Sequence, residues 1–134
     1  MIRVVLDTNI LVSGLLSTFG NSAEIINAIT DRVIACFYSD AIIQEYTDVL
    51  SRPKFGFPQE KADALIRDIS KVGHLIVPTQ STHFLPDESD RIFYDVAKAS
   101  KAYLITGNNK HYPNESFILS PAEFVDKFHK RAIK

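Results

Sequence analysis

The residues with the most potential for chemistry are four acids and one amide. Asp7 follows a short apolar run near the start of the chain, and Asn108 follows another such run. Asp87 and Asp90 come just before an apolar segment with helical spacing, and Glu45 lies inside an expected helix. Carboxylates that meet raise one another's pKa unless a cation neutralises them. Their hard oxygen ligands favour Mg²⁺ or Mn²⁺. Such a site activates water and stabilises the leaving oxygen in phosphodiester cleavage.

The elements that would position these residues alternate between strands and helices. The expected strands cover residues 2–6, 33–38, 74–77, 102–106 and 117–119. The expected helices cover residues 9–16, about 21–31, 40–52 and 59–72, a segment after 87–90, and a segment starting at 121. This alternation predicts an α/β fold: a three-layer α/β/α sandwich around a parallel sheet of four to five strands. The five polar residues would then lie at the carboxyl edge of the sheet, where ligands bind in such folds.

The composition fits one compact domain over residues 1–134. The chain is 46% hydrophobic and carries a formal net charge of -1. A nucleic-acid ligand would therefore have to be met by a local basic patch or by bound cations. The basic tail (Lys127, His129, Lys130, Arg131 and Lys134) is predicted to be solubilising charge at the end of a helix.

Other sequence features bear on the cellular compartment of the protein and on membrane association. The single cysteine, Cys36, lies in an apolar run and is expected in the core. The start of the chain lacks the pattern of a signal peptide, and no apolar run approaches the ~20 residues that span a bilayer. We therefore expect a cytoplasmic protein with no membrane partner.

Each acid also has an ordinary structural interpretation. A lone Asp at a strand end or helix start usually caps a helix or stays in solvent. A further set of acids is typical of solvated helix faces: Asp40, Asp48, Asp63, Asp68 and Asp95. Five aromatic residues could form an exposed patch for dimerisation, but packing within the chain is the favoured interpretation: Tyr38, Phe55, Phe57, Phe84 and Tyr112. Only the coincidence of positions indicates an active site.

Four segments resemble the motifs of PIN-domain ribonucleases. Residues 4–13 (VVLDTNILVS) resemble the opening of that family, and residues 39–46 (SDAIIQEY) resemble the motif in which a helical Glu binds metal. Residues 86–93 (PDESDRIF) and 104–108 (LITGN) resemble the third and fourth motifs. The order and spacing match over nearly the whole chain. The likeness is greatest to the toxin components of prokaryotic toxin–antitoxin pairs.

The resemblance implies cleavage of single-stranded RNA that depends on Mg²⁺ or Mn²⁺, and inhibition by a small cognate antitoxin. A homodimer is also expected from it. Carried over by position, the metal ligands would be Asp7, Glu45 and Asp90, with Asp87 as an accessory acid. Many members have an Asp where this chain has Asn108, so one well-formed metal site is expected, with a second that is weak or forms only with substrate.

Five further residues would support the site. Thr8 and Asn9 would orient the first acid or a bound water, and Thr106 would steady the end of the fourth strand. Arg91 and Lys110 are weaker candidates for contact with substrate phosphate, since either could be an ordinary surface cation.

Two other functions remain open. A phosphotransfer domain would want a second acid two residues after Asp7, where the chain has Asn9, and a late lysine such as Lys110. A non-catalytic module that binds RNA or a protein partner would keep the fold with a decayed site, and Asn108 is the feature that favours this alternative.

Overall fold

A computed structural model describes residues 1–128 of the chain. The central sheet has five strands in the order β3-β2-β1-β4-β5, and every neighbouring pair is parallel. The strands are β1 (Arg3–Leu6), β2 (Ala35–Tyr38), β3 (His74–Leu75), β4 (Tyr103–Ile105) and β5 (Ile118–Leu119). The predicted parallel α/β sheet is therefore confirmed. Part of the basic tail, residues 129–134, lies outside the described residues.

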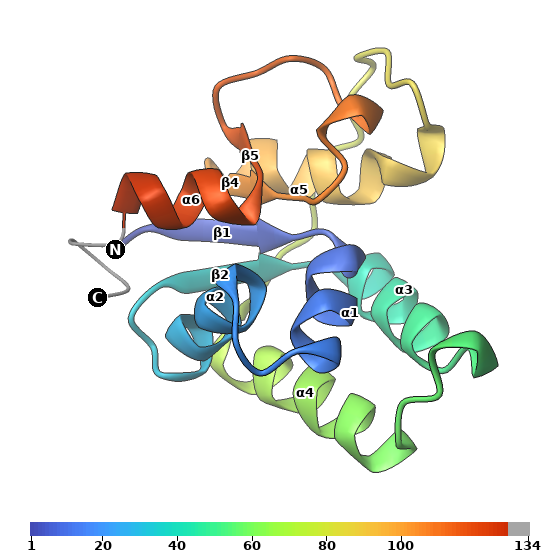
Figure 1. The fold of residues 1–134 in the computed structure, drawn as a ribbon. Helices are drawn as coiled ribbons and strands as arrows, with labels where there is room; N and C mark the ends of the chain where they lie inside the picture. Colours follow the sequence, from blue (N-terminus) through green and yellow to red (C-terminus); the bar gives the residue numbers. More distant parts are fainter. Residues whose placement is uncertain (129–134) are drawn as a thin grey trace.

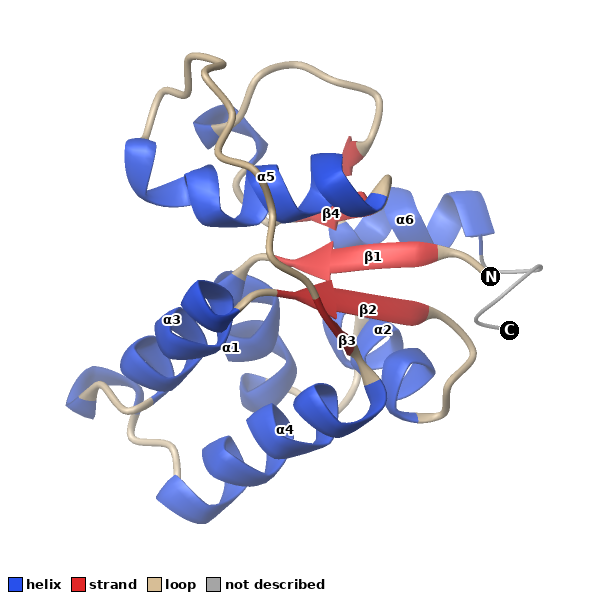
Figure 2. Cartoon of the chain, turned by 180° about the vertical axis from the view of Figure 1, so that it is seen from behind, coloured by secondary structure: helices blue, strands red, loops and turns tan. Residues whose placement is uncertain are grey.

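Helices cover both faces of the sheet. They are α1 (Thr8–Leu16), α2 (Asn21–Thr30), α3 (Asp40–Leu50), α4 (Gln59–Val72), α5 (Arg91–Ser100) and α6 (Pro121–Phe128). Three short 3₁₀ turns are η1 (Pro53–Phe55), η2 (Glu88–Asp90) and η3 (Asn109–His111). Figure 1 shows α1, α2 and α6 in front of the sheet, and Figure 2 shows α5 on the opposite face, across β1 and β4. The expected three layers are present.

The core begins with β1, whose side chains at Val4, Val5 and Leu6 are fully buried. Burial on both faces is what a continuous apolar run at the centre of a parallel sheet requires. Cys36 is buried beside this strand on β2, as expected of a core residue. Burial raises the pKa of its thiol to about 12, which suits a packing role.

Polar residues at the starts of two helices form the capping hydrogen bonds that the sequence predicts. Ser39 accepts a hydrogen bond from the backbone N–H of Ile42 at the start of α3. Ser120 and Glu123 form a reciprocal capping box at α6, with distances of 2.8 and 3.1 Å. These caps fix where two helices leave the carboxyl edge of the sheet.

Gly73 joins α4 to β3 at a close approach between backbone segments. A Cβ atom at this position would lie 2.7 Å from the carbonyl oxygen of Ile69 and 3.0 Å from that of Cys36. Because both neighbours are backbone atoms, a larger residue would push α4 away from β2. Glycine is therefore required for packing here.

Two expectations about the elements need correction. β3 spans only His74–Leu75, not residues 74–77, because it is an exposed edge strand. Asp95 is not a solvated acid: it is 6% exposed, and its Oδ2 accepts a hydrogen bond from the backbone N–H of Ser81. Asp95 is buried because the 76–85 segment covers the face of α5 on which it lies.

The aromatic residues mostly pack within the chain, as favoured. Tyr38 and Tyr112 are buried, and Phe55 stacks on Phe57 with ring centroids 5.5 Å apart. Phe84 is the exception, since it is 81% exposed. These residues therefore do not make one aromatic patch. None of the helices within residues 1–128 combines the length and apolarity needed to cross a membrane.

Candidate active site at the carboxyl edge of the sheet

Asp7 lies immediately after β1 and is nearly buried, with 8% of the residue exposed. Two hydroxyl groups donate hydrogen bonds to its Oδ2. One comes from Thr106, just after β4, at 2.8 Å, and the other from Tyr112, just after η3, at 3.0 Å. The carboxylate is thereby held in one orientation by segments about one hundred positions away.

The pKa of Asp7 is raised, and burial is the largest cause because it disfavours the charged form. The hydrogen bonds from Thr106 and Tyr112 lower the pKa, and so do the backbone N–H groups of Thr8 and Asn9 at the start of α1. These donors stabilise the carboxylate without outweighing its burial. A nearby cation would favour the charged form further.

One more hydrogen bond joins the ends of β1 and β4, and another closes the turn after β4. The side-chain oxygen of Asn9 accepts from the backbone N–H of Gly107 at 3.0 Å. Oγ1 of Thr106 accepts from the backbone N–H of Asn108 at 3.0 Å. Thr106 therefore does more than steady a strand end, since it links this turn to Asp7. The buried Oγ1 of Thr8 has no hydrogen-bond partner among the described residues.

A second group of side chains lies on η2 and η3. Asp87, Asp90 and His111 each offer a ligand atom, and these atoms all lie within 4.8 Å of one another. Nδ1 of His111 lies 3.3 Å from Oδ2 of Asp90, so the two form an ion pair when the imidazole is protonated. Asp87 is more exposed and caps η2 by accepting from the N–H of Ser89 at 3.0 Å.

Asp90 links this group to Asp7. Its pKa is raised to about 6, first by burial and then by the negative charges of Asp7 and Asp87, while His111 lowers it. Its side chain is 14% exposed. Asp90 thus lies near enough to both Asp7 and Asp87 for their negative charges to act on its carboxylate. Three of the predicted acids therefore meet at the carboxyl edge.

The donor set fits a divalent cation. Oδ2 of Asp90 is a buried oxygen that receives no hydrogen bond from residues 1–128. A buried carboxylate oxygen without a donor is costly unless a cation or water satisfies it. The neighbouring groups are carboxylates and an imidazole, which are metal ligands. Asp7, Asp87, Asp90 and His111 could therefore hold a metal.

Glu45 has no recorded contact with the other predicted ligands among the described residues. It is half-buried on α3, and it makes no hydrogen bond or ion pair within the described part of the chain. It is not a member of the Asp87, Asp90 and His111 cluster. Its role as a ligand remains a prediction.

Arg91 and Lys110 are predicted to contact substrate phosphate, and they differ in how far contacts within the chain already engage their side chains. Arg91 donates to the carboxylate of Glu88, to the backbone oxygen and Oγ of Ser81, and to the backbone oxygen of His83. All of its nitrogen atoms are engaged in these contacts, which tie the 81–83 loop to α5. Lys110 is exposed on η3. Lys110 is therefore the better candidate for contact with phosphate.

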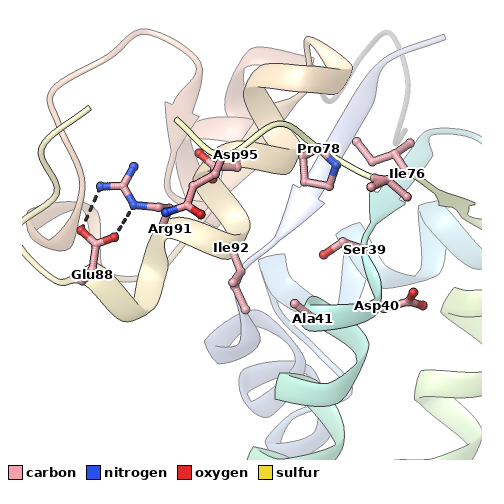
Figure 3. A pocket seen from close by; sticks show the side chains of 11 residues that line it. Ser39, Asp40, Ala41, Ile76, Pro78, Glu88, Arg91, Ile92 and Asp95 are labelled. Carbon is pink, nitrogen blue, oxygen red and sulfur yellow. Dashed lines mark hydrogen bonds and ion pairs between the residues drawn. The ribbon is translucent and has the colours of Figure 1, made fainter. Parts of the chain in front are cut away.

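The cavity in Figure 3 is separate from the acidic group. It has a volume of about 420 Å³ and lies between the start of α3, the segment after β3 and α5. Ser39, Ile76, Arg91 and Asp95 are among the residues that line it, and Asp7 and Asp90 are not. The carboxylates of Asp7 and Asp90 therefore do not open into this cavity.

Two residues of the site were missed from the sequence, His111 and Tyr112. They follow the fourth apolar run by only a few positions, and a histidine so close to a strand end is a signal that could have drawn notice. Neither belongs to a periodic segment, because they lie on and after the 3₁₀ turn η3. Only the fold shows that this turn doubles back over Asp7 and Asp90.

Comparisons with known proteins identify the family of the chain. The family model described as PIN domain matches residues 3–110. The uncharacterized protein MJ1680 of Methanocaldococcus jannaschii is 28% identical over 144 residues, which cover 96% of this chain and 93% of that protein. The crystal structure of VapBC2 from Rickettsia felis, bound to a DNA fragment from their promoter, matches with a TM-score of 0.59 and 18% identity. That match covers 89% of this chain and 98% of the other, and at this identity it shows a shared fold. Because the family model spans most of the chain, the protein belongs to the PIN domain family.

Proposed function

We propose that this protein is a metal-dependent endoribonuclease that cleaves single-stranded RNA. The observation that carries the proposal is the convergence of Asp87, Asp90 and His111, whose ligand atoms lie within 4.8 Å of one another, beside the buried carboxylate of Asp7. Three carboxylates at one sheet edge need a cation, and membership of the PIN domain family agrees with a nuclease site.

The metal would be Mg²⁺ or Mn²⁺, held by Asp7, Glu45 and Asp90, with Asp87 and Asn108 as further oxygen donors. The bound ion would supply positive charge that activates water and stabilises the leaving oxygen. Thr106 and Tyr112 keep the Asp7 carboxylate oriented through the two hydrogen bonds to its Oδ2. Lys110 would attract the RNA phosphate, and Asn9 joins the two strand ends through Gly107.

We further propose that the protein is the toxin of a toxin–antitoxin pair. The resemblance of its four motifs to such toxins supports this, and so does the shared fold with VapBC2 from Rickettsia felis. A small antitoxin protein would then be its partner. We also propose one PIN-like domain over residues 1–134, a homodimer and a cytoplasmic location. Light scattering of the purified protein tests the dimer.

The direct test is cleavage of a labelled single-stranded RNA by the purified, metal-free protein. Cleavage should appear when Mn²⁺ or Mg²⁺ is added and stop with EDTA. Single-stranded DNA of the same sequence serves as the comparison substrate. RNA that stays intact with both metals would count against the proposal.

The second candidate is a non-catalytic module that binds RNA or a protein partner. Asn108 favours it, because an amide stands where many family members have a charged ligand. RNA binding that leaves the RNA intact, unchanged by Asp7→Asn, would support this candidate. The phosphotransfer alternative has less support, since the side-chain oxygen of Asn9 is engaged by the N–H of Gly107. Labelling of Asp7 by beryllofluoride would revive it.

A further inference from the structure

We propose that His111 is a metal ligand, together with Asp87 and Asp90, and that it makes the site bind Mn²⁺ in preference to Mg²⁺. The inference rests on the proposed function only in placing a divalent cation at this edge of the sheet. It adds a nitrogen donor and a metal preference that the carboxylates alone do not give.

The first observation is the position of the imidazole. His111 is half-exposed on η3, and its Nδ1 lies 3.3 Å from Oδ2 of Asp90. The ligand atoms of Asp87, Asp90 and His111 lie within 4.8 Å of one another. Three donors from two separate turns therefore converge on one point, where a shared cation could contact all of them.

The second observation concerns Oδ2 of Asp90, which faces the imidazole of His111. Oδ2 of Asp90 is buried and receives no hydrogen bond within residues 1–128, although the imidazole is 3.3 Å away. With a proton on Nδ1 the imidazole pairs with this oxygen, whereas without that proton two lone pairs face each other and both atoms are unsatisfied. A cation between them would satisfy both.

The backbone around His111 holds it in this place. The N–H of His111 donates to the carbonyl of Asn108 at 3.0 Å, which closes one 3₁₀ turn. Residues three apart on such a turn share a side, so Asn108 and His111 face the same region. The side-chain amide nitrogen of Asn108 accordingly lies 3.4 and 3.3 Å from the two imidazole nitrogens. Tyr112, the next residue, is fixed to Asp7.

This arrangement explains how the chain could function without an acid at position 108. The donor from the β4 side would come from His111, three residues later. Mg²⁺ and Mn²⁺ both take carboxylate, carbonyl and water ligands, but imidazole is a ligand of first-row transition metals, to which Mn²⁺ belongs and Mg²⁺ does not. Exchange of a carboxylate for an imidazole therefore shifts the preference toward Mn²⁺.

The test uses Mn²⁺ and Mg²⁺ with metal-free full-length protein. Titration calorimetry gives both affinities, and electron spin echo spectroscopy detects a ¹⁴N nucleus bound to Mn²⁺. Wild type should show the ¹⁴N signal. His111→Ala should lose it and bind Mn²⁺ at least ~10-fold more weakly, while Mg²⁺ affinity changes by less than ~3-fold. The matched control, His83→Ala, removes an exposed histidine on another loop and should leave both values unchanged.

The double variant Asn108→Asp with His111→Ala should bind Mn²⁺ without the ¹⁴N signal and bind Mg²⁺ more tightly than wild type. Circular dichroism confirms that each variant is folded. A wild-type protein that binds Mn²⁺ with no ¹⁴N signal would overturn the assignment of His111 and leave the nuclease proposal intact. A His111-dependent signal without RNA cleavage would support the assignment and count against the nuclease proposal.

Discussion

Tyr112 donates a 3.0 Å hydrogen bond to Oδ2 of Asp7, across a sequence separation of 105 residues. The same oxygen accepts from Thr106, so two donors from the β4 side of the site fix the carboxylate that ends β1. The turn that carries Tyr112 also carries His111, which faces Asp90. The η3 segment therefore contacts both central acids of the site, one through each of two consecutive residues.

Tyr112→Phe removes one of the two donors to Asp7 and leaves the ring in place. Loss of a hydrogen bond to a buried carboxylate should lower the free energy of unfolding by about 1–3 kcal/mol. RNA cleavage should fall ~10–100-fold, as is typical when a supporting partner of a metal ligand is removed. Denaturant titration and initial rates measure the two effects.

The matched control is Tyr103→Phe. The Tyr103 ring packs against Phe124 and Phe128, and its hydroxyl makes no hydrogen bond within residues 1–128. This change should alter stability by less than ~0.5 kcal/mol. Equal effects of the two variants would contradict the importance of the hydrogen bond to Asp7.

Asp90 should make the metal-free protein less stable as the pH rises from about 4 to about 6. Its pKa is about 6 in the folded protein against a usual value of 3.8, so the folded state binds more protons in this window. The free energy of unfolding then falls with rising pH. Asp7, whose pKa is also raised, acts in the same direction.

Asp90→Asn should flatten this slope, as measured by denaturant titration in EDTA at several pH values. The lowered pKa values of Asp87, Glu88 and Glu123 act at more acidic pH, where they stabilise the protein as they ionise. They therefore do not produce the fall between 4 and 6. An identical slope in wild type and Asp90→Asn would contradict the role given to Asp90.

Arg91→Gln should loosen the 81–83 loop. The guanidinium joins this loop to Glu88 and α5 through Ser81 and His83. Its loss should lower stability by about 1–3 kcal/mol, since hydrogen bonds to charged groups are broken. The loop should also become a site of cleavage in limited proteolysis.

The control for Arg91 is Arg52→Gln, which breaks an exposed ion pair to Asp48 at 3.3 Å. Exposed pairs contribute little, so the change should stay below ~0.5 kcal/mol with no new proteolytic site. Proteolysis of the 81–83 loop at the same rate in Arg91→Gln and wild type would show that Arg91 does not hold it.

Much of the fold could be predicted because its signals are local. The apolar runs that became β1 and β2, the cap at Ser39 and the capping box at Ser120 each depend on neighbouring residues. The position of Asp7 at the carboxyl edge could be predicted because it directly follows an apolar run, and strand ends in a parallel sheet share one edge.

The rest of the site could not be predicted, because it depends on contacts between distant segments. Tyr112 and His111 belong to an irregular turn whose path over Asp7 no periodicity encodes. Asp95 has the spacing of an exposed helix position and is buried only because a loop covers it. The engagement of every nitrogen of Arg91 is likewise set by that loop.

Asn108→Asp should strengthen Mg²⁺ binding, because the amide adds no charge to the site and a carboxylate would. An increase of about 10-fold is expected, since the charge of the ligand set tunes affinity for hard cations. Calorimetry with the metal-free variant and wild type measures it. No gain in affinity would show that position 108 does not reach the metal.

The most direct test of the central claim is the cleavage rate of Asp7→Asn on single-stranded RNA with Mn²⁺. Asparagine keeps an oxygen that can accept from Thr106 and Tyr112, so the fold should be retained. The control is Asp68→Asn, an exposed acid on α4 without an ion pair within the described residues. Asp7→Asn should lower kcat/KM by more than ~100-fold, beyond the 10–100-fold typical of a supporting residue, and Asp68→Asn should not change it. Wild-type activity in a folded Asp7→Asn protein would contradict the account.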